Sequence, residues 1–322
     1  MADTKPPRIN ADKPHLWKAD IAASVDRFNQ WFTEFAPEAF RSTRVKASEH
    51  VRKALVATSD LRNLNAATLK ANPGVLPTLR MCTAPPLAVD RLVGLAGANK
   101  NLVRLMEKGK LPSKMPATVL DAELTRISGV LCRLLDRDIF PWLDNDEGPA
   151  DHERQRASTI VADRLCSAVA NPIVRNAHER RQLALIADYL EQLGYRKQHH
   201  PSDKPLTDME PGTYTFHLNV PVGRTHKVNV PIDVVIQPKK LSKNRLPIFI
   251  EAKSAGDFAN PNKRRKEEAT KIHQLRATYG DRLIFVLFLC GYFGTDYLGY
   301  EAAEGIDWVW EHRIDDLGKL GL

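Results

Sequence analysis

Two carboxylates and a lysine lie in stretches of the sequence that alternate like β-strands. Asp233 falls in the run 228–234, where apolar residues recur at every second position, and Glu251 and Lys253 stand two apart at the end of the apolar run 246–252. Residues two apart on a strand share a face, so these two side chains point together toward Asp233, while the isoleucines of their run point into the core. Charged side chains are seldom found in the middle of a sheet unless they are paired or have a function.

The combination suits the hydrolysis of a phosphodiester. Two carboxylates offer the hard oxygen ligands of a divalent cation, which polarises a phosphate and lowers the pKa of a bound water. A lysine ammonium orients the attacking water or neutralises charge that develops on the phosphorus centre. The alternative is an exposed ion pair between Glu251 and Lys253 with Asp233 at a strand end, because Glu-x-Lys is short and common. The apolar strand before the tripeptide, Asp233 upstream and a basic helix downstream favour the catalytic interpretation.

The spacing of apolar residues predicts the elements that position these residues. From 16 to about 193 the period is helical, and the polar stretch 144–149 predicts a domain boundary followed by two helical segments, 151–168 and 174–193. Further along the chain the period becomes two, and the connection at 221–226 has the length of a hairpin.

The C-terminal third is predicted to form a sheet with a helix inserted in it. The expected elements are strands at 214–220, 228–234 and 246–252, a basic helix at 262–279 and a fully buried strand at 283–290. We therefore predict an α+β protein, in which a helical N-terminal domain (1–148) precedes a mixed β-sheet flanked by helices (149–322).

The catalytic residues stand in a recognisable motif. Pro231-Ile232-Asp233 followed by Glu251-Ala252-Lys253 resembles the PD-(D/E)xK motif of nucleases, and the order of the elements agrees with that core. Ile232 separates the proline from the aspartate, so Asp257 stays open as a competing carboxylate. The chain also resembles the XamI group of type II restriction endonucleases at 250–257, 262–268 and 280–285 and, in the helical half, at 32–62 and 72–105.

This resemblance implies a restriction-endonuclease-like core that uses Mg²⁺ to hydrolyse double-stranded DNA at a short palindromic site. It implies that Asp233 and Glu251 bind the metal, that the Ala252 carbonyl adds a ligand, and that Lys253 positions the water. A homodimer, in which each chain cuts one strand, is implied as well. So is a cognate DNA methyltransferase that protects the host DNA.

Nucleases with this core often use one more carboxylate from the helix before the sheet. Glu179 and Glu191 are the candidates, and helical phase places Glu179 on the inward face, one turn before Leu183, with Glu191 nearly opposite. We expect Glu179 to assist catalysis. The alternative is a solvated charge near the start of the helix.

Basic and polar side chains on the helix after the catalytic strand are candidates for contacts to DNA phosphates. The expected DNA-binding residues are Lys263, Arg264, Arg265, Lys266, Lys271 and Gln274. Glu267 and Glu268 interrupt this run, so a solvated helix face is the alternative. A second basic cluster, from Arg41 to Lys53, has the same two interpretations.

Composition agrees with a partner that is a polyanion. Lysine and arginine outnumber aspartate and glutamate by 47 to 39, for a net charge of +8. The four cysteines are far apart in the sequence, which argues against a disulfide scaffold and fits the reducing cytoplasm. The longest unbroken apolar run, 283–290, is too short to cross a bilayer, so we expect no membrane segment.

Two other functions are compatible with the same residues. One is a nuclease of the same core that acts in repair or on structured DNA without sequence specificity. The other is a non-catalytic DNA-binding protein whose charged strand residues are structural. In the catalytic interpretation, alanine at Glu251 or Lys253 abolishes cleavage and leaves folding nearly intact.

Overall fold

The computed structural model describes residues 8–223, 227–240 and 246–322, and for residues 260 and 262–264 it describes the backbone alone. The middle of the predicted hairpin connection, 224–226, lies outside the described residues. The chain forms two compact units, one of residues 36–173 and one that joins the first 35 residues to 174–322.

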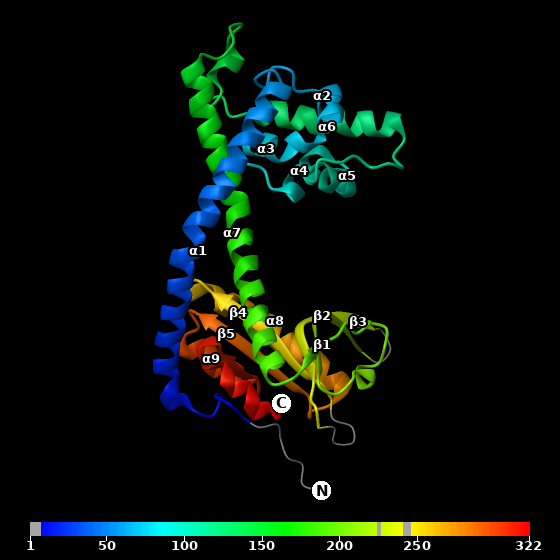
Figure 1. Ribbon diagram of the computed structural model, residues 1–322. Helices are drawn as coiled ribbons and strands as arrows, with labels where there is room; N and C mark the ends of the chain where they lie inside the picture. Colours follow the sequence, from blue (N-terminus) through cyan, green and yellow to red (C-terminus); the bar gives the residue numbers. More distant parts are fainter. Residues whose placement is uncertain (1–7, 224–226, 241–245) are drawn as a thin grey trace. The chain divides into compact units, whose positions relative to one another are not determined.

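Two long helices, α1 (Pro14–Ala57) and α7 (Asp151–Gln192), contribute residues to both units (Figure 1). Each contains a proline within two residues of the division, Pro37 in α1 and Pro172 in α7. The two segments predicted on either side of Pro172 are thus one helix. A proline inside a helix removes one backbone hydrogen bond, and here the flanking turns keep their helical geometry.

The unit of residues 36–173 is helical and has its own apolar core. Helix α6 shows why: its buried residues Leu120, Leu124, Ile127 and Leu131 recur at three- and four-residue spacing and form one stripe. The elements between the two long helices are α2 (Ala66–Ala71), η1 (Pro73–Val75), α3 (Leu76–Met81), α4 (Val89–Ala96), α5 (Lys100–Met106), α6 (Ala117–Leu134) and η2 (Pro141–Asp144).

The second unit is built around a six-stranded mixed sheet whose strands lie in sequence order. The first and second strands pair in parallel. The second, third and fourth strands pair antiparallel, and the fourth, fifth and sixth pair in parallel. The strands are β1 (Arg196–Lys197), β2 (Thr213–Val222), β3 (Val228–Gln237), β4 (Ile248–Ala255), β5 (Ile284–Gly291) and β6 (Asp307–Trp310). The helices of this unit are η3 (Leu206–Asp208), α8 (Ala259–Tyr279), α9 (Thr295–Ala303) and η4 (Glu311–Leu320), besides its parts of α1 and α7.

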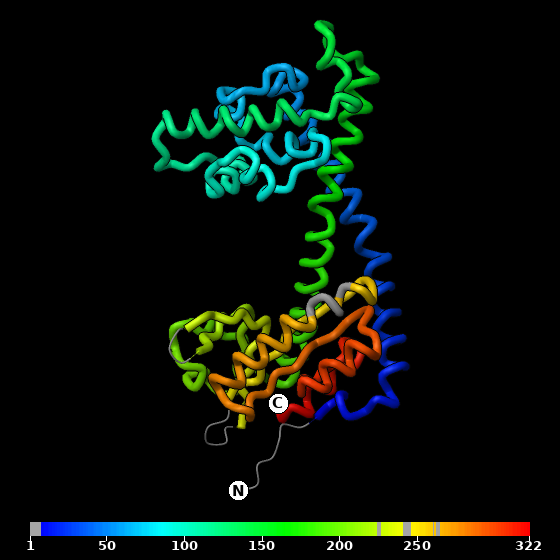
Figure 2. The backbone as a smooth tube through the Cα atoms, turned by 180° about the vertical axis from the view of Figure 1, so that it is seen from behind, coloured from blue at the N-terminus to red at the C-terminus, as the bar shows by residue number. Residues whose placement is uncertain are grey.

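Helices cover both faces of this sheet. On one face Phe249 and Leu287 pack in a core with Ile272 of α8 and Leu298 of α9, and Figure 2 shows these two helices on the same side of the strands. On the other face Ile248, Ile250, Val286 and Phe288 pack with Leu183, Ile186 and Leu190 of α7 and Leu317 of η4. The predicted α+β architecture is confirmed, and the isoleucines of β4 point into the core as expected.

Strands β1 and β6 were not predicted. Among the helices that the structure describes, none is both long and apolar enough to cross a membrane.

Candidate active site

Two breaks in strand pairing define the site. Between β2 and β3 the pairing passes from Phe216–Val234 to Leu218–Ile232 and skips His217 and Asp233. Between β3 and β4 the last pair is Val234–Ile250, and the next residues along the two strands are Asp233 and Glu251. The ladder pairing of β3 therefore stops at Asp233 and Glu251, and we call this break between β3 and β4 the fork.

Asp233 lies in this fork, half-buried. Its Oδ2 accepts a hydrogen bond from the backbone N–H of Ala252 at 2.9 Å. Burial and the negative charge of Glu251 raise the pKa of Asp233 to about 6, although the Ala252 hydrogen bond and the nearby Lys253 and Lys271 oppose the shift.

Glu251 is 6% exposed. Its Oε1 lies 2.8 Å from Nζ of Lys271 and 3.1 Å from Nζ of Lys253, and its buried Oε2 has no hydrogen-bond partner among the residues described. Lys271 also donates to the carbonyl oxygen of Pro231 at 2.8 Å. Lys271, which the sequence suggested as a DNA contact, thus lies against the carboxylate of Glu251 in this structure.

Lys253 bridges two buried carboxylates. Its Nζ is 3.2 Å from Oε1 of Glu268 on α8, in addition to its contact with Glu251. Burial lowers the pKa of Lys253, but the charges of the two glutamates outweigh burial and raise it overall. Behind them lies Glu301 of α9, whose pKa burial and the charge of Glu268 raise to about 8. A mostly protonated Glu301 and a charged Lys253 therefore accompany the carboxylates at neutral pH.

Glu179 of α7 and His217 of β2 meet Asp233 on its other side. One ligand atom of each of these three residues lies within 4.8 Å of the others. His217 has φ +53°, in the left-handed region that residues other than glycine seldom adopt and that is often found at functional sites. Glu191 lies elsewhere and accepts a hydrogen bond from the hydroxyl of Tyr214 at 2.8 Å.

Sequence reasoning missed His217 and Glu268. His217 falls on one of the polar positions that alternate with the apolar ones in β2, and a lone histidine in a strand carries no motif. Glu268 was counted as an interruption of a basic run, whereas its side chain is 3% exposed and faces the sheet. The helical spacing of Glu268, Ile272 and Leu275, which puts them on one face of α8, could have indicated this burial.

The other candidates on α8 are spread over its surface. The guanidinium of Arg265 lies 4.8 Å from the ring centroid of Tyr300, and Lys266 and Gln274 are exposed. The side chains of Lys263 and Arg264 are outside the described residues. Asp257, the competing carboxylate, is exposed and accepts a hydrogen bond from the backbone N–H of Ala259 at 2.9 Å.

Comparison with known proteins identifies the class. The chain matches the model of the XamI restriction endonuclease family over residues 59–310, which include the fork and the side chains described around it. It belongs to this family and is a restriction endonuclease, an enzyme that cleaves DNA at specific sites. The resemblance inferred from the sequence motifs is thereby confirmed.

A full-length relative narrows the class. The chain is 56% identical over 313 residues, 97% of this chain and 99% of the relative, to the type II restriction enzyme SalI of Streptomyces albus G. No solved structure matches the chain at a significant level. Type II restriction endonucleases generally need a divalent metal ion, and their substrate is DNA.

Proposed function

We propose that this protein is a type II restriction endonuclease that uses Mg²⁺ to hydrolyse double-stranded DNA at a short palindromic sequence. The observation that carries the proposal is the fork between β3 and β4, which brings Asp233 and Glu251 together with Lys253 beside them. The relative's activity as a type II restriction enzyme supports it.

Two features of the fork fit a divalent cation. The Oε2 atom of Glu251 is buried without a partner in the described part of the chain, and the charge of Glu251 raises the pKa of Asp233. A cation held by these carboxylates and the Ala252 carbonyl would stabilise both negative charges. Bound there, Mg²⁺ would polarise the scissile phosphate and lower the pKa of a water ligand.

The side chains of the fork do the remaining work. The ammonium of Lys253 is held between Glu251 and Glu268, so it is oriented before DNA binds. From there it donates to the attacking water or to a phosphate oxygen, where negative charge grows in the transition state. Glu268 acts through Lys253 and is a positioning residue. Lys271 pairs with Oε1 of Glu251 at 2.8 Å and holds that carboxylate in place.

Glu179 and His217 form the second half of the proposed centre. Their carboxylate and imidazole face Asp233 and can hold a water molecule or a further cation on that side. Imidazole binds Mn²⁺ and heavier divalent metals better than Mg²⁺. His217 therefore tunes which metal ion the enzyme accepts.

The DNA is held by basic side chains on both units. On the C-terminal unit we assign this role to Lys263, Arg264, Arg265, Lys266 and Gln274. The helical unit offers a hollow of about 720 Å³ whose polar lining includes His50, Arg52, Lys53 and Asn72. Phosphate contacts of this kind position an enzyme on DNA, and amide groups are suited to base edges.

The same proposal implies an oligomeric state, a partner enzyme and a cellular compartment. A palindromic site calls for a homodimer with one active site for each strand. A cognate methyltransferase is required to protect the host DNA. The four cysteines, all within the described residues, are free, in keeping with the reducing cytoplasm.

Digestion of a sequenced, unmethylated plasmid, followed by mapping of the product ends, tests the proposal. Discrete fragments that share one short sequence are expected with Mg²⁺, and intact plasmid with EDTA. A smear of fragments would favour a nuclease without sequence specificity. The absence of cutting with any divalent ion would favour a non-catalytic DNA-binding protein and contradict the proposal.

A further inference from the structure

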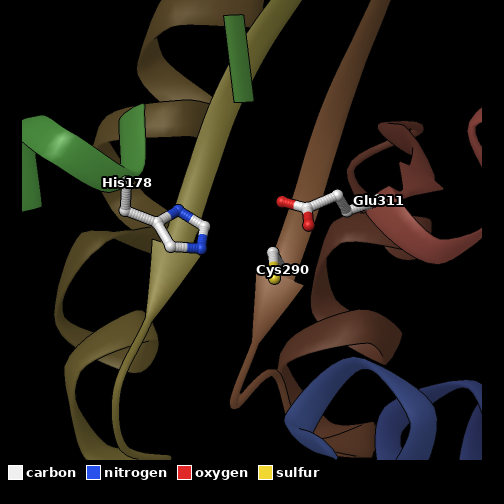
Figure 3. A group of neighbouring side chains, drawn as sticks. All are labelled: His178, Cys290 and Glu311. Atoms are coloured by element: carbon white, nitrogen blue, oxygen red, sulfur yellow. The ribbon is translucent and has the colours of Figure 1, made fainter. Parts of the chain in front are cut away.

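A second group of metal-binding side chains lies away from the fork, in the core between α7 and the sheet. His178 of α7, Cys290 of β5 and Glu311 of η4 each offer a ligand atom, and these atoms lie within 4.8 Å of one another. Figure 3 shows the three side chains directed toward a common point from three separate elements. Their exposed fractions are 1%, 0% and 2%, so the point is shielded from solvent.

Some of the polar atoms around this point have no hydrogen-bond partner among the described residues. In the described chain neither ring nitrogen of His178 has a hydrogen-bond partner, and the same holds for Oε2 of Glu311. Gln182, one turn along α7, directs its amide nitrogen to the backbone oxygens of Lys253 and Phe288. Buried polar groups without a partner are destabilising and are rare in native structures.

We propose that His178, Cys290 and Glu311 bind a structural transition-metal ion of the zinc type. Nitrogen, thiolate sulfur and carboxylate oxygen are the ligands that Zn²⁺ takes in proteins, with bonds of about 2.0–2.3 Å. Tetrahedral bonds of that length place the ligand atoms roughly 3.5 Å apart. Since the ligand atoms lie within 4.8 Å of one another, they need to close by at most about 1.3 Å, which rotamer adjustment provides. Three protein ligands leave the fourth position to a water molecule.

Two guanidinium groups pair with the carboxylate of the site and leave one of its oxygens unpaired. Nε of Arg27 and a terminal nitrogen of Arg181 lie 2.7 and 2.8 Å from Oε1 of Glu311, which leaves Oε2 for the metal. With Cys290 as thiolate, two negative and two positive groups sum to zero. Zinc binds tightly to three neutral histidines in some enzymes, so a neutral set of ligands and neighbours is compatible with binding.

The protonation states agree with this role. Burial lowers the pKa of His178 to about 4, so its imidazole is neutral and can act as a ligand at neutral pH. Burial and the charge of Glu311 raise the pKa of Cys290, so the thiol is protonated in the metal-free protein. Binding then releases this proton to solvent as the sulfur–metal bond forms.

The site would fasten the catalytic unit together. It joins α7 to β5 and η4, and His178 is followed directly by Glu179, which faces Asp233. Aromatic rings of Phe28 and Trp31, with centroids 5.2 and 4.5 Å from that of His178, limit movement of the imidazole. The inference stands without the proposed nuclease mechanism, because it depends only on the three ligands and their burial.

Metal content and a sulfur-specific spectrum test the site. Full-length protein, dialysed against a weak chelator, is expected to retain one equivalent of zinc by mass spectrometry. After exchange with Co²⁺ it should show a sulfur-to-cobalt charge-transfer band, which the carboxylates of the fork cannot produce. Cys290→Ser should lose both signals. Cys132→Ser is the matched control, because Cys132 is only half-buried and its Sγ donates to the Leu64 carbonyl, and it should keep both.

Two results would overturn the inference. The first is wild-type protein that binds no stoichiometric metal and shows no sulfur-to-cobalt band when Co²⁺ is supplied. The second is a Cys290→Ser variant, folded by circular dichroism, that retains the metal of the wild type. The wild-type spectrum decides the matter even if the variant does not fold.

Discussion

The bridge formed by Lys253 predicts that one substitution has separable effects on stability and on cleavage. Nζ of Lys253 is 3.1 Å from Oε1 of Glu251 and 3.2 Å from Oε1 of Glu268. Each contact has a gross Coulomb energy of about 5 kcal/mol at an effective dielectric constant near 20. Desolvation offsets most of this, but removal of one partner from a buried pair still costs about 3–5 kcal/mol.

The contacts around Lys253 show which carboxylate becomes unpaired when Lys253 is replaced. In Lys253→Met, Glu251 keeps Lys271 at 2.8 Å, so Glu268 is the carboxylate that loses its positive partner. The expected fall in the free energy of unfolding is about 3 kcal/mol, the lower end of that range. Adding Glu268→Gln removes the stranded charge and should restore about 2 kcal/mol. Cleavage should stay absent in the double variant, because the ammonium is still missing.

Urea unfolding measures the effect on stability, and single-turnover cleavage of plasmid DNA measures the effect on activity. Both are applied to the wild type, Lys253→Met, Glu268→Gln and the double variant. The reasoning is refuted if the two substitutions destabilise additively, since that would mean that Lys253 and Glu268 do not interact. It is also refuted if Lys253→Met cleaves DNA like the wild type. Cleavage regained in the double variant would show that Lys253 serves only to compensate Glu268.

Two further predictions concern residues around the fork. Glu301 has a folded pKa of about 8 against an ordinary value of 4.5, so its contribution to stability is present below pH 4.5 and is lost as pH rises through 8. Between pH 6 and 8 the free energy of unfolding of the wild type should fall by about 2 kcal/mol more than that of Glu301→Gln. Urea unfolding at both pH values measures this difference, and equal losses in the two proteins would contradict it. His217→Ala should weaken the binding of Mn²⁺ at least about tenfold, by calorimetry without DNA, and an unchanged affinity would exclude His217 as a ligand.

The fold was largely predictable where the pattern is local and long. The alternation in β2, β3 and β4 and the continuous apolar run of β5 indicated strands correctly. β1 and β6, with two and four residues, are too short for a period to emerge. Trp308 and Trp310, in β6, are fully buried, which only the completed sheet explains.

The contacts of residues 9–11 with β6 could not be predicted from the local sequence pattern. The side chain of Asn10 donates to the carbonyl oxygen of Trp308, and the backbone N–H groups of residues 9–11 donate to Asp307. Contacts across nearly 300 residues depend on tertiary packing alone. The division predicted at 148, between a helical domain and a sheet domain, stays a prediction, while the compact units are formed by 36–173 and by the rest of the chain.

The site was predictable only in part. The spacing of Asp233, Glu251 and Lys253 follows from strand periodicity, so their approach could be expected. Glu268 and His217 join them through packing between distant elements, which periodicity does not reveal. Burial of Lys253 in that network also changes one expectation: a substitution there should affect folding as well as cleavage.

The most direct test of the account compares two aspartates, Asp233→Asn and Asp257→Asn, in single-turnover cleavage with Mg²⁺. Asp257 is exposed, and asparagine retains the oxygen that accepts the Ala259 N–H. The account predicts that Asp233→Asn lowers the cleavage rate roughly 1000-fold, for a loss of about 4 kcal/mol of transition-state stabilisation, while Asp257→Asn cuts DNA like the wild type. Full activity in Asp233→Asn, or its loss in Asp257→Asn alone, would contradict the assignment of the fork as the catalytic centre.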